Sequence, residues 1–390
     1  FPLYQPIAPS MLLSSLEFLS GKRLKTVTIY DKLSETKEQV ISLIKLLRVF
    51  YQAKLKFFSL GTNLLSGEYS VPLLRRISRV RSLVGVNLDS PNAAIIDELK
   101  YIANLPKLSH ILLKLYDNVQ VKQQSESLEN SFNRWKEISN CTIVSIVPDI
   151  CIFSRLVQEA LNLKRLNIHF IPQSPFEIDG KSQIFPPELQ YLFDHLDAFK
   201  RLEALEFIHE DIGHSDDAKK YLNMVPVKSL SALTCLQRLV IAGHRDNGPI
   251  LNFGELGEAL GSMKSLKYIK LCFATTSEDF SAFLHSSSKN LEKIEELDFV
   301  LTMEDNISFG EEFVHWLSSK KALRSLKLWL RVLYIPRKVV EYVTQGISSL
   351  KALKHLNLSI GGHPGGGTPT EGSAFVDLST KIINSCKSLR

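Results

Sequence analysis

The stretch Leu266-Lys-Tyr-Ile-Lys-Leu271 decides the fold, because its pattern of apolar residues recurs along nearly the whole chain. The pattern is apolar-x-x-apolar-x-apolar, and its last three positions alternate as the residues of a short β-strand do. Twelve copies start at Leu24, Leu55, Leu83, Leu108, Ile138, Leu163, Leu202, Leu236, Leu266, Ile294, Leu323 and Leu353. The eleven intervals between these starts cover 329 residues, so the period is about 30 residues. This regular period predicts a solenoid of stacked units, since one unit cannot bury its own apolar face.

Between the strand patterns the apolar spacing changes to three and four residues, which is typical of amphipathic helices. This spacing predicts helices over residues 255–263, 279–284, 311–317 and 339–347. Asn252-Phe-Gly-Glu255 and Ser308-Phe-Gly-Glu311 have the form of capping boxes at helix starts. A strand, a helix and a second parallel strand form a right-handed unit. The sequence therefore predicts an α/β solenoid shaped as a curved arc, with a parallel β-sheet on the concave face and helices on the convex face.

Segments such as Leu266-Lys-Tyr-Ile-Lys-Leu271 and Leu353-Lys-His-Leu-Asn-Leu358 resemble leucine-rich repeats, and the repeat length resembles the ribonuclease-inhibitor-like subclass. The resemblance covers roughly residues 21–390 and implies about 12–13 repeats, the last one truncated, after an N-terminal segment or partial cap at residues 1–20. This subclass usually has Asn or Cys three residues after the motif. Asn63 fits, whereas the chain departs from the pattern at Pro91, His244, Thr302 and Arg331, so the resemblance is to a divergent member.

Composition bounds the class of protein. The apolar fraction of 44% and the charged fraction of 23% are normal for a soluble folded chain. The 47 Lys and Arg exceed the 41 Asp and Glu by six, a mild excess that permits nucleic acid or an acidic protein as partner without requiring either. Five scattered cysteines with no C-x-x-C pair predict reduced, buried thiols and a cytoplasmic location. No apolar run approaches the ~20 residues of a membrane span, and we expect none.

Three clusters have a chemical and a plainer interpretation. His209-Glu-Asp-Ile-Gly-His214 has its His residues five apart, not four as a zincin motif needs, so a solvated acidic turn is favoured over a loop metal site with Asp216 or Asp217. The Gly-rich segment 361–372 lacks the Lys of a phosphate-binding loop. The densest basic cluster could contact phosphates, but without an interleaved aromatic platform a solvated face is favoured for Arg75, Arg76, Arg79 and Arg81. With no nucleophile–base–acid set, we expect no enzyme, cofactor or metal.

A repeat solenoid is chiefly a recognition scaffold, so the sequence predicts a protein–protein interaction scaffold or a structural subunit of a larger assembly. Binding is expected through the concave face and the loops. Alternation turns the residues between the buried apolar ones toward that face, and exposed Trp, Tyr and Arg are enriched among binding hot spots. The partner-binding candidates are Arg238, Tyr268, Lys270, Glu296, Asp298, Lys327, Trp329, His355 and Asn357. Protein is the expected partner class, and nucleic acid is disfavoured.

Three alternatives for the function stay open. The first is a substrate receptor of a ubiquitin ligase, similar to F-box proteins with such repeats, although residues 1–21 show no convincing F-box. The second is a GTPase activator similar to the Ran GTPase-activating protein, but the acidic tail and a catalytic Arg are not found. The mild positive charge permits a ribonucleoprotein subunit. The repeat pattern is interrupted by segments that are polar or rich in Pro and Gly, at residues 116–135, 171–189, 209–231 and 361–372. These segments either carry function or are tolerated insertions between repeats.

Overall fold

The computed structural model of the 390-residue chain describes residues 25–31, 45, 47, 54–62, 70–90, 101–102, 105–115, 137–145, 157–158, 160–170, 177–178, 181–182, 187–209, 227–243, 253–287, 291–303, 310–332 and 337–362. The chain divides into two compact units, which we call unit 1 (Phe1–Ile171) and unit 2 (Pro172–Arg390). A single array over residues 21–390 stays a prediction.

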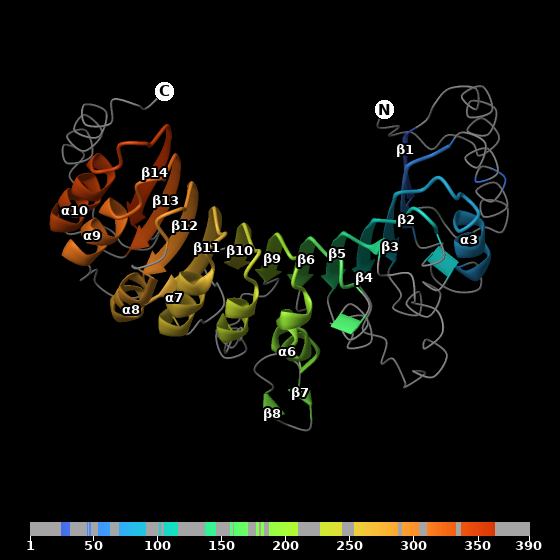
Figure 1. The fold of residues 1–390 in the computed structure, drawn as a ribbon, viewed down its shortest axis with the longest axis horizontal. Helices are drawn as coiled ribbons and strands as arrows, with labels where there is room; N and C mark the ends of the chain where they lie inside the picture. The colour runs from blue at the N-terminus through green and yellow to red at the C-terminus, as the bar shows by residue number, and fades with distance from the viewer. Residues whose placement is uncertain are drawn as a thin grey trace. The chain divides into compact units, whose positions relative to one another are not determined.

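Unit 1 contains six parallel strands, each paired with the next one in the sequence (Figure 1). They are β1 (Thr26–Asp31), β2 (Phe57–Thr62), β3 (Gly85–Ser90), β4 (His110–Leu115), β5 (Asn140–Ser145) and β6 (Arg165–Phe170). Helix α3 (Ser70–Ile77) joins β2 to β3 and buries Leu73, Leu74 and Ile77. Their three- and four-residue spacing puts these side chains on one helix face, which packs into the apolar layer of the unit.

Unit 2 also contains six parallel strands paired in sequence order. They are β9 (Ala204–His209), β10 (Arg238–Gly243), β11 (Tyr268–Thr275), β12 (Glu296–Met303), β13 (Ser325–Val332) and β14 (His355–Gly362). Helices α7 (Phe253–Ser262), α8 (Ser277–Ser287), α9 (Glu311–Ser318) and α10 (Arg337–Ser348) cover one face of this sheet (Figure 1). The unit also has α6 (Pro187–Asp194), the 3₁₀ helices η5 (Leu196–Ala198) and η7 (Val227–Ala232), and a short antiparallel pair, β7 (Glu177–Ile178) with β8 (Lys181–Ser182).

The register confirms the repeat motif. Each of the twelve motif copies falls on one strand, and equivalent positions lie opposite one another, as Leu326 and Leu356 do. Leu326 is buried, and Leu356 is half-buried because β14 has a paired strand on one side only among the described residues. The four helices predicted from three- and four-residue spacing correspond to α7–α10. Each unit is therefore an α/β repeat solenoid, while the curved arc stays a prediction.

An aromatic cluster fills the core between α8, α9 and β12. The ring centroids of Phe280 and Phe299 are 6.3 Å apart, and those of Phe299 and Trp316 are 5.8 Å apart. Trp316 Nε1 donates a hydrogen bond to Ser287 Oγ at 2.9 Å, so the indole N–H is satisfied inside this apolar layer.

The start of α9 corrects one sequence prediction. The N-cap is Gly310, not Ser308, and no side chain caps the helix there. A Cβ on Gly310 would meet the ring of Tyr342 on α10 at 2.4 Å, so close packing between the helices sets where α9 begins. Asn252, in the other predicted capping box, lies outside the described residues.

One lysine occupies a core position. The residue three places before each motif is apolar and buried in the other described repeats: Val80, Leu105, Ala160, Phe199, Leu233, Met263, Leu291 and Leu350. In the eleventh repeat it is Lys320, which is only 1% exposed. Its Nζ lies 4.5 Å from the centroid of the Trp316 ring and donates to Ser319 Oγ at 2.8 Å. Burial lowers the pKa of Lys320 to about 8, against an opposing effect of the Glu292 charge.

The cysteines follow the prediction in part. Cys141, Cys235 and Cys272 are free thiols, and burial raises the pKa of Cys141 to about 12. Cys235 is exposed, in the turn that leads into β10, so the prediction of a buried thiol is wrong there. Cys151 and Cys386 lie outside the described residues. Separately, in the part of the chain that the structure describes, no helix is both long enough and apolar enough to cross a bilayer.

Candidate partner-binding face

The nine residues predicted to bind a partner all lie on one face of unit 2. We call the sheet face turned away from the helices the open face. Side chains alternate between the two faces, as the burial pattern of β12 shows, and none of the nine candidates is buried, although Val240 and Ala242 of β10 on the same face are. The register arranges the side chains of the open face in rows that cross the strands. The alternation inferred from the motif therefore places these residues correctly, while their role in binding stays a prediction.

Three rows can be followed from β10 to β14. The first row contains Arg238, Tyr268, Glu296, Ser325 and His355. The second row contains Val240, Lys270, Asp298, Lys327 and Asn357, and the third contains Ala242, Cys272, Val300, Trp329 and Ser359. The structure thus brings together residues that are more than a hundred positions apart in the sequence.

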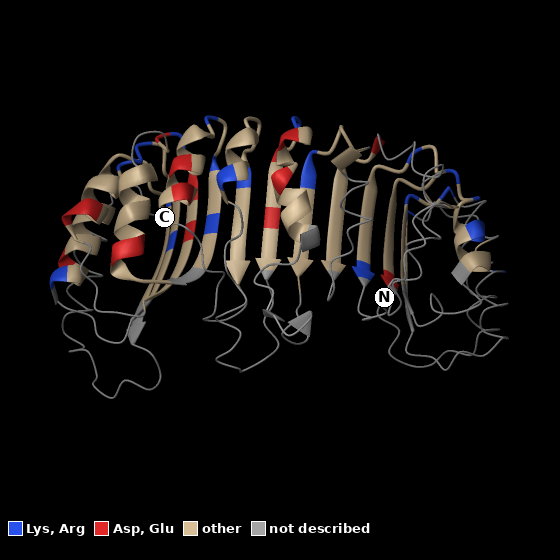
Figure 2. Cartoon of the chain, turned by 90° about the horizontal axis from the view of Figure 1, so that it is seen from below, with Lys and Arg blue, Asp and Glu red and all other residues tan. Residues whose placement is uncertain are grey.

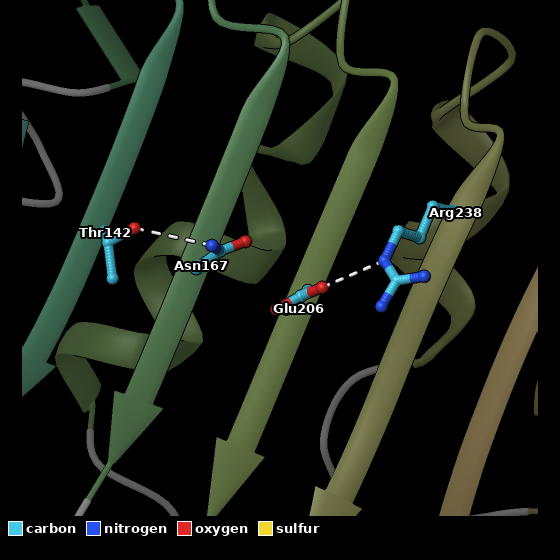
Figure 3. A network of polar contacts seen from close by, with 4 residues as sticks. All are labelled: Thr142, Asn167, Glu206 and Arg238. Carbon is cyan, nitrogen blue, oxygen red and sulfur yellow. Dashed lines mark hydrogen bonds and ion pairs between the residues drawn. The ribbon is translucent and has the colours of Figure 1, made fainter. Parts of the chain in front are cut away.

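Arg238 lies at the centre of a pre-ordered cluster. Its guanidinium carbon is 3.8 Å from the centroid of the Tyr268 ring, and its Nε donates to Glu206 Oε1 on β9 at 2.9 Å (Figure 3). Burial lowers the pKa of Arg238, but the hydrogen bond and charge of Glu206, together with Tyr268, outweigh this and leave the pKa raised. The guanidinium is held on two sides. A partner that binds it therefore causes little further loss of side-chain entropy.

Glu206 was missing from the candidates of the sequence analysis. It occupies the same motif position as Val240 and Lys270, one and two repeats earlier, between the buried Leu205 and Phe207. Applying the motif register to the Leu202 repeat would have found it. Its contribution depends on the register, which sets Glu206 diagonally across from Arg238 on the neighbouring strand.

A second charged group surrounds Asp298. Lys327 Nζ lies 3.4 Å from Asp298 Oδ2, and Lys270 lies next to Asp298 on the other side in the register. Asp298 Oδ1 is buried without a hydrogen-bond partner in the described structure. A buried acceptor left in this state costs free energy that a donor from a partner would recover.

Trp329 gives the open face its large apolar group. Its side chain is 38% exposed on β13, in the row of Val300 and Ser359. Strand spacing alone predicts a patch about 10 Å across for Tyr268, Lys327 and Trp329, since two strand steps separate β11 from β13. Tyr268 is level with Ser325, four residues before Trp329, so two strand steps and four residues separate them by about 16 Å. The patch is longer than predicted, and it runs diagonally.

Unit 1 presents an open face that the sequence analysis did not single out. Its first row contains Phe57, Gly85, His110, Asn140 and Arg165. The Phe57 ring is 41% exposed and lies over Gly85, where an added Cβ would meet it at 2.4 Å. The rings of Phe57 and His110 meet edge to face, with centroids 5.9 Å apart. The motif register would have placed all five residues on this face, but not the ring over the glycine.

His110 is held in one orientation. Asn140 Nδ2 donates to His110 Nε2, which assigns the ring proton to Nδ1 and directs it to Ser109 Oγ at 2.8 Å. Burial, and then the charge of Arg165, lower the pKa of His110, so the ring is neutral at pH 7. In the next row Asn167 Nδ2 donates to Thr142 Oγ1 at 3.4 Å (Figure 3). The cross-strand contacts in these two rows are therefore uncharged.

The three clusters for which the sequence left a chemical interpretation open do not form a site among the described residues. Arg75 on α3 donates to the hydroxyl of Tyr101 at 2.7 Å, whereas Arg79 and Arg81 are exposed in the turn before β3. His214 and its acidic neighbours, and residues 363–372, lie outside the described residues. Among the residues that are described, no group of three His, Cys, Asp or Glu side chains could hold a metal ion.

No family model and no curated protein matches this chain. Among solved structures, the chain is similar to one titled "Crystal structure of Rad7 and Elc1 complex in yeast", with 15% sequence identity, 96% of this chain and 81% of that chain covered, and a TM-score of 0.44. A likeness this distant assigns neither a family nor a partner.

Proposed function

We propose that this chain is a protein-interaction scaffold, or a structural subunit of a larger assembly, that binds a partner protein through the open face of unit 2. The observation that supports this most is the ordered cluster of Arg238, Tyr268 and Glu206 beside the exposed Trp329. Arg, Tyr and Trp dominate binding hot spots, and rigid anchors lose less entropy on binding than mobile ones.

The chemistry of this face fits a protein surface with both charges and apolar groups. Arg238 and Lys327 are balanced by Glu206 and Asp298, so the face does not select strongly for one sign of charge. Such a face would recognise a partner through shape, through an apolar contact at Trp329 and through a donor for Asp298 Oδ1. We propose binding rather than catalysis, in the cytoplasm.

A quantitative pull-down tests the proposal. The full chain and a Trp329→Ala, Lys327→Glu variant are compared for the proteins they retain, after circular dichroism has shown that both are folded. The control is Lys338→Glu, which substitutes the same residue type with the same charge change on the exposed side of α10. Loss of specific partners from the double variant, and not from the control, is the expected result. An unchanged partner set would rule out the open face of unit 2 as the binding surface.

The three alternative functions remain predictions. An F-box would have to include residues that the structure does not describe, and the described residues favour neither a GTPase activator nor a ligase receptor. The nucleic-acid alternative gains separate support from unit 1.

A further inference from the structure

The charge of the chain is distributed unevenly between its two units. Unit 1 contains 22 Lys and Arg against 14 Asp and Glu, a net charge of +8. Unit 2 contains 25 Lys and Arg against 27 Asp and Glu, a net charge of −2. The mild excess of the whole chain therefore hides a strongly basic unit, and a basic unit attracts polyanions.

The cations of unit 1 gather where its strands begin. Figure 2 shows blue segments on the turns at the end of the strands opposite the arrowheads. We call these turns the strand-start edge. Its exposed cations are Lys25, Lys54, Arg79, Arg81, Lys107 and Lys164, and the exposed acid described on this edge is Glu137. Backbone hydrogen bonds hold the turns in register, since the N–H groups of Lys56 and Phe57 both donate to Lys25 O. Successive turns are thus about 4.8 Å apart, which makes a row of positive charge.

Helix polarity explains part of this arrangement. Cations near the C-terminal ends of helices are favoured by the helix dipole, and the turns that lead into strands follow such ends. The same effect operates in unit 2, where Lys264, Lys321 and Lys351 occupy comparable turns. There, Glu295 lies 3.9 Å from Lys267 and 3.7 Å from Arg324, so one acid faces two further cations. The strand-start turns are therefore basic in both units, and unit 1 is distinguished by its net charge of +8 and by the exposed ring beside its edge.

An exposed aromatic ring lies directly beside this edge. Phe57 follows Lys56 in the sequence and begins β2, and its ring rests on Gly85 of the next strand with 41% of the residue exposed. Because Gly85 has no side chain, the ring atoms Cδ1 and Cε1 of Phe57 can lie where a Cβ would otherwise be. His110, Asn140 and Arg165 continue the row with a neutral aromatic ring, an amide and a guanidinium. Proteins bind unpaired strands by stacking aromatic rings on the bases and by placing cations next to the phosphates.

We propose that the strand-start edge and the first open-face row of unit 1 form a site for single-stranded nucleic acid. The cations of the edge contact the phosphates, Phe57 stacks on a base, and Asn140 and Arg165 face the neighbouring bases. A duplex does not fit this description, since its bases are already stacked on one another. An acidic protein would use the cations but not the ring. This site goes beyond the proposed function and uses a different unit.

Fluorescence anisotropy with the full chain tests the site. The probes are labelled oligo(U) and oligo(dT) of about twelve nucleotides and a duplex of the same length. Both single strands are expected to bind more tightly than the duplex. Tighter binding of oligo(U) assigns the ligand to RNA, and tighter binding of oligo(dT) assigns it to DNA. Equal or tighter binding of the duplex, or no binding of either single strand, would overturn the proposal.

Two sets of variants, each with a matched control, separate the role of the Phe57 ring from that of the cations. Phe57→Ala is expected to weaken binding about tenfold and Phe57→Trp to retain it, whereas Leu161→Ala, which also trims an exposed apolar side chain of unit 1, should have no effect. A triple change of Lys54, Arg81 and Lys107 to Gln should reduce the slope of log affinity against log salt by about 2. The same change at Lys264, Lys321 and Lys351 is the control in unit 2, and its slope should stay at the wild-type value. An effect of the control as large as that of the unit 1 triple, or wild-type binding by Phe57→Ala, contradicts the site.

Discussion

Units 1 and 2 share one buried motif and present different surfaces. In both, the motif leucines and isoleucines fill the layer under the sheet. On the open face, unit 2 crosses its strands with the charged pairs Arg238 with Glu206 and Lys327 with Asp298. Unit 1 has one such pair, Lys114 with Asp89, beside uncharged contacts such as Asn167 with Thr142. The buried positions are constrained by packing, which tolerates few changes in volume. The accessible positions between them carry no such constraint, so two stretches of the same fold can differ in what they bind.

The largest expected effects test whether both units depend on the same buried layer. Leu166→Ala in unit 1 and Leu326→Ala in unit 2 remove a buried leucine from the same motif position and should each cost about 2–5 kcal/mol in the free energy of unfolding. Leu356→Ala should cost less, because that side chain is half-buried. Urea denaturation measures all three. A loss at Leu356 as large as at Leu326 would show that the layer continues past β14.

Replacing the buried Lys320 of unit 2 should have the next largest effect on the free energy of unfolding. Lys320→Met should stabilise the chain at pH 7 by about 1–3 kcal/mol, because a charged amine no longer has to be buried. The pKa of Lys320 is about 8 in the folded chain, below its ordinary value of 10.5. Between these pH values the unfolded chain binds more protons, so wild-type stability should rise from pH 8 toward pH 10.5 and the advantage of the variant should shrink. Thermal melts across this range measure it, and a constant advantage would contradict the burial of a charged amine.

A smaller effect distinguishes the two kinds of cross-strand contact. Double-mutant cycles on Arg238 with Glu206 and on Asn167 with Thr142 should give coupling energies of about 0.5 and 0.2 kcal/mol. Raising the salt concentration should weaken the first, since Arg238 is accessible to solvent, and leave the second unchanged. Equal salt dependence in the two cycles would mean that the charges on the open face of unit 2 do not interact as their distances indicate.

The smallest expected effect concerns the thiols and involves no change in stability. Cys235 should react with an alkylating reagent in the folded chain at pH 8, whereas Cys141 should react only after unfolding, because burial raises its pKa to about 12 and blocks access. Mass spectrometry of the labelled peptides measures both sites. Early labelling of Cys141 would show that the layer under β5 opens readily.

The sequence determined the repeat. Twelve motif copies at a period of about 30 residues predicted twelve strands, and the alternation of apolar residues predicted which side chains are buried, because a pleated strand turns successive residues to opposite faces. All nine partner-binding candidates lie on the expected face for the same reason. The helices α7–α10 followed from their spacing, while the start of α9 did not, because contact with α10 decided it.

The tertiary structure alone decided which accessible residues meet. Phe57 rests on Gly85 and Arg238 reaches Glu206 because parallel pairing brings residues about 30 positions apart to neighbouring strands. The motif specifies the buried positions of each repeat but is silent about the residues between them. Their contacts depend on register and on the length of each side chain, and neither can be read from a single repeat.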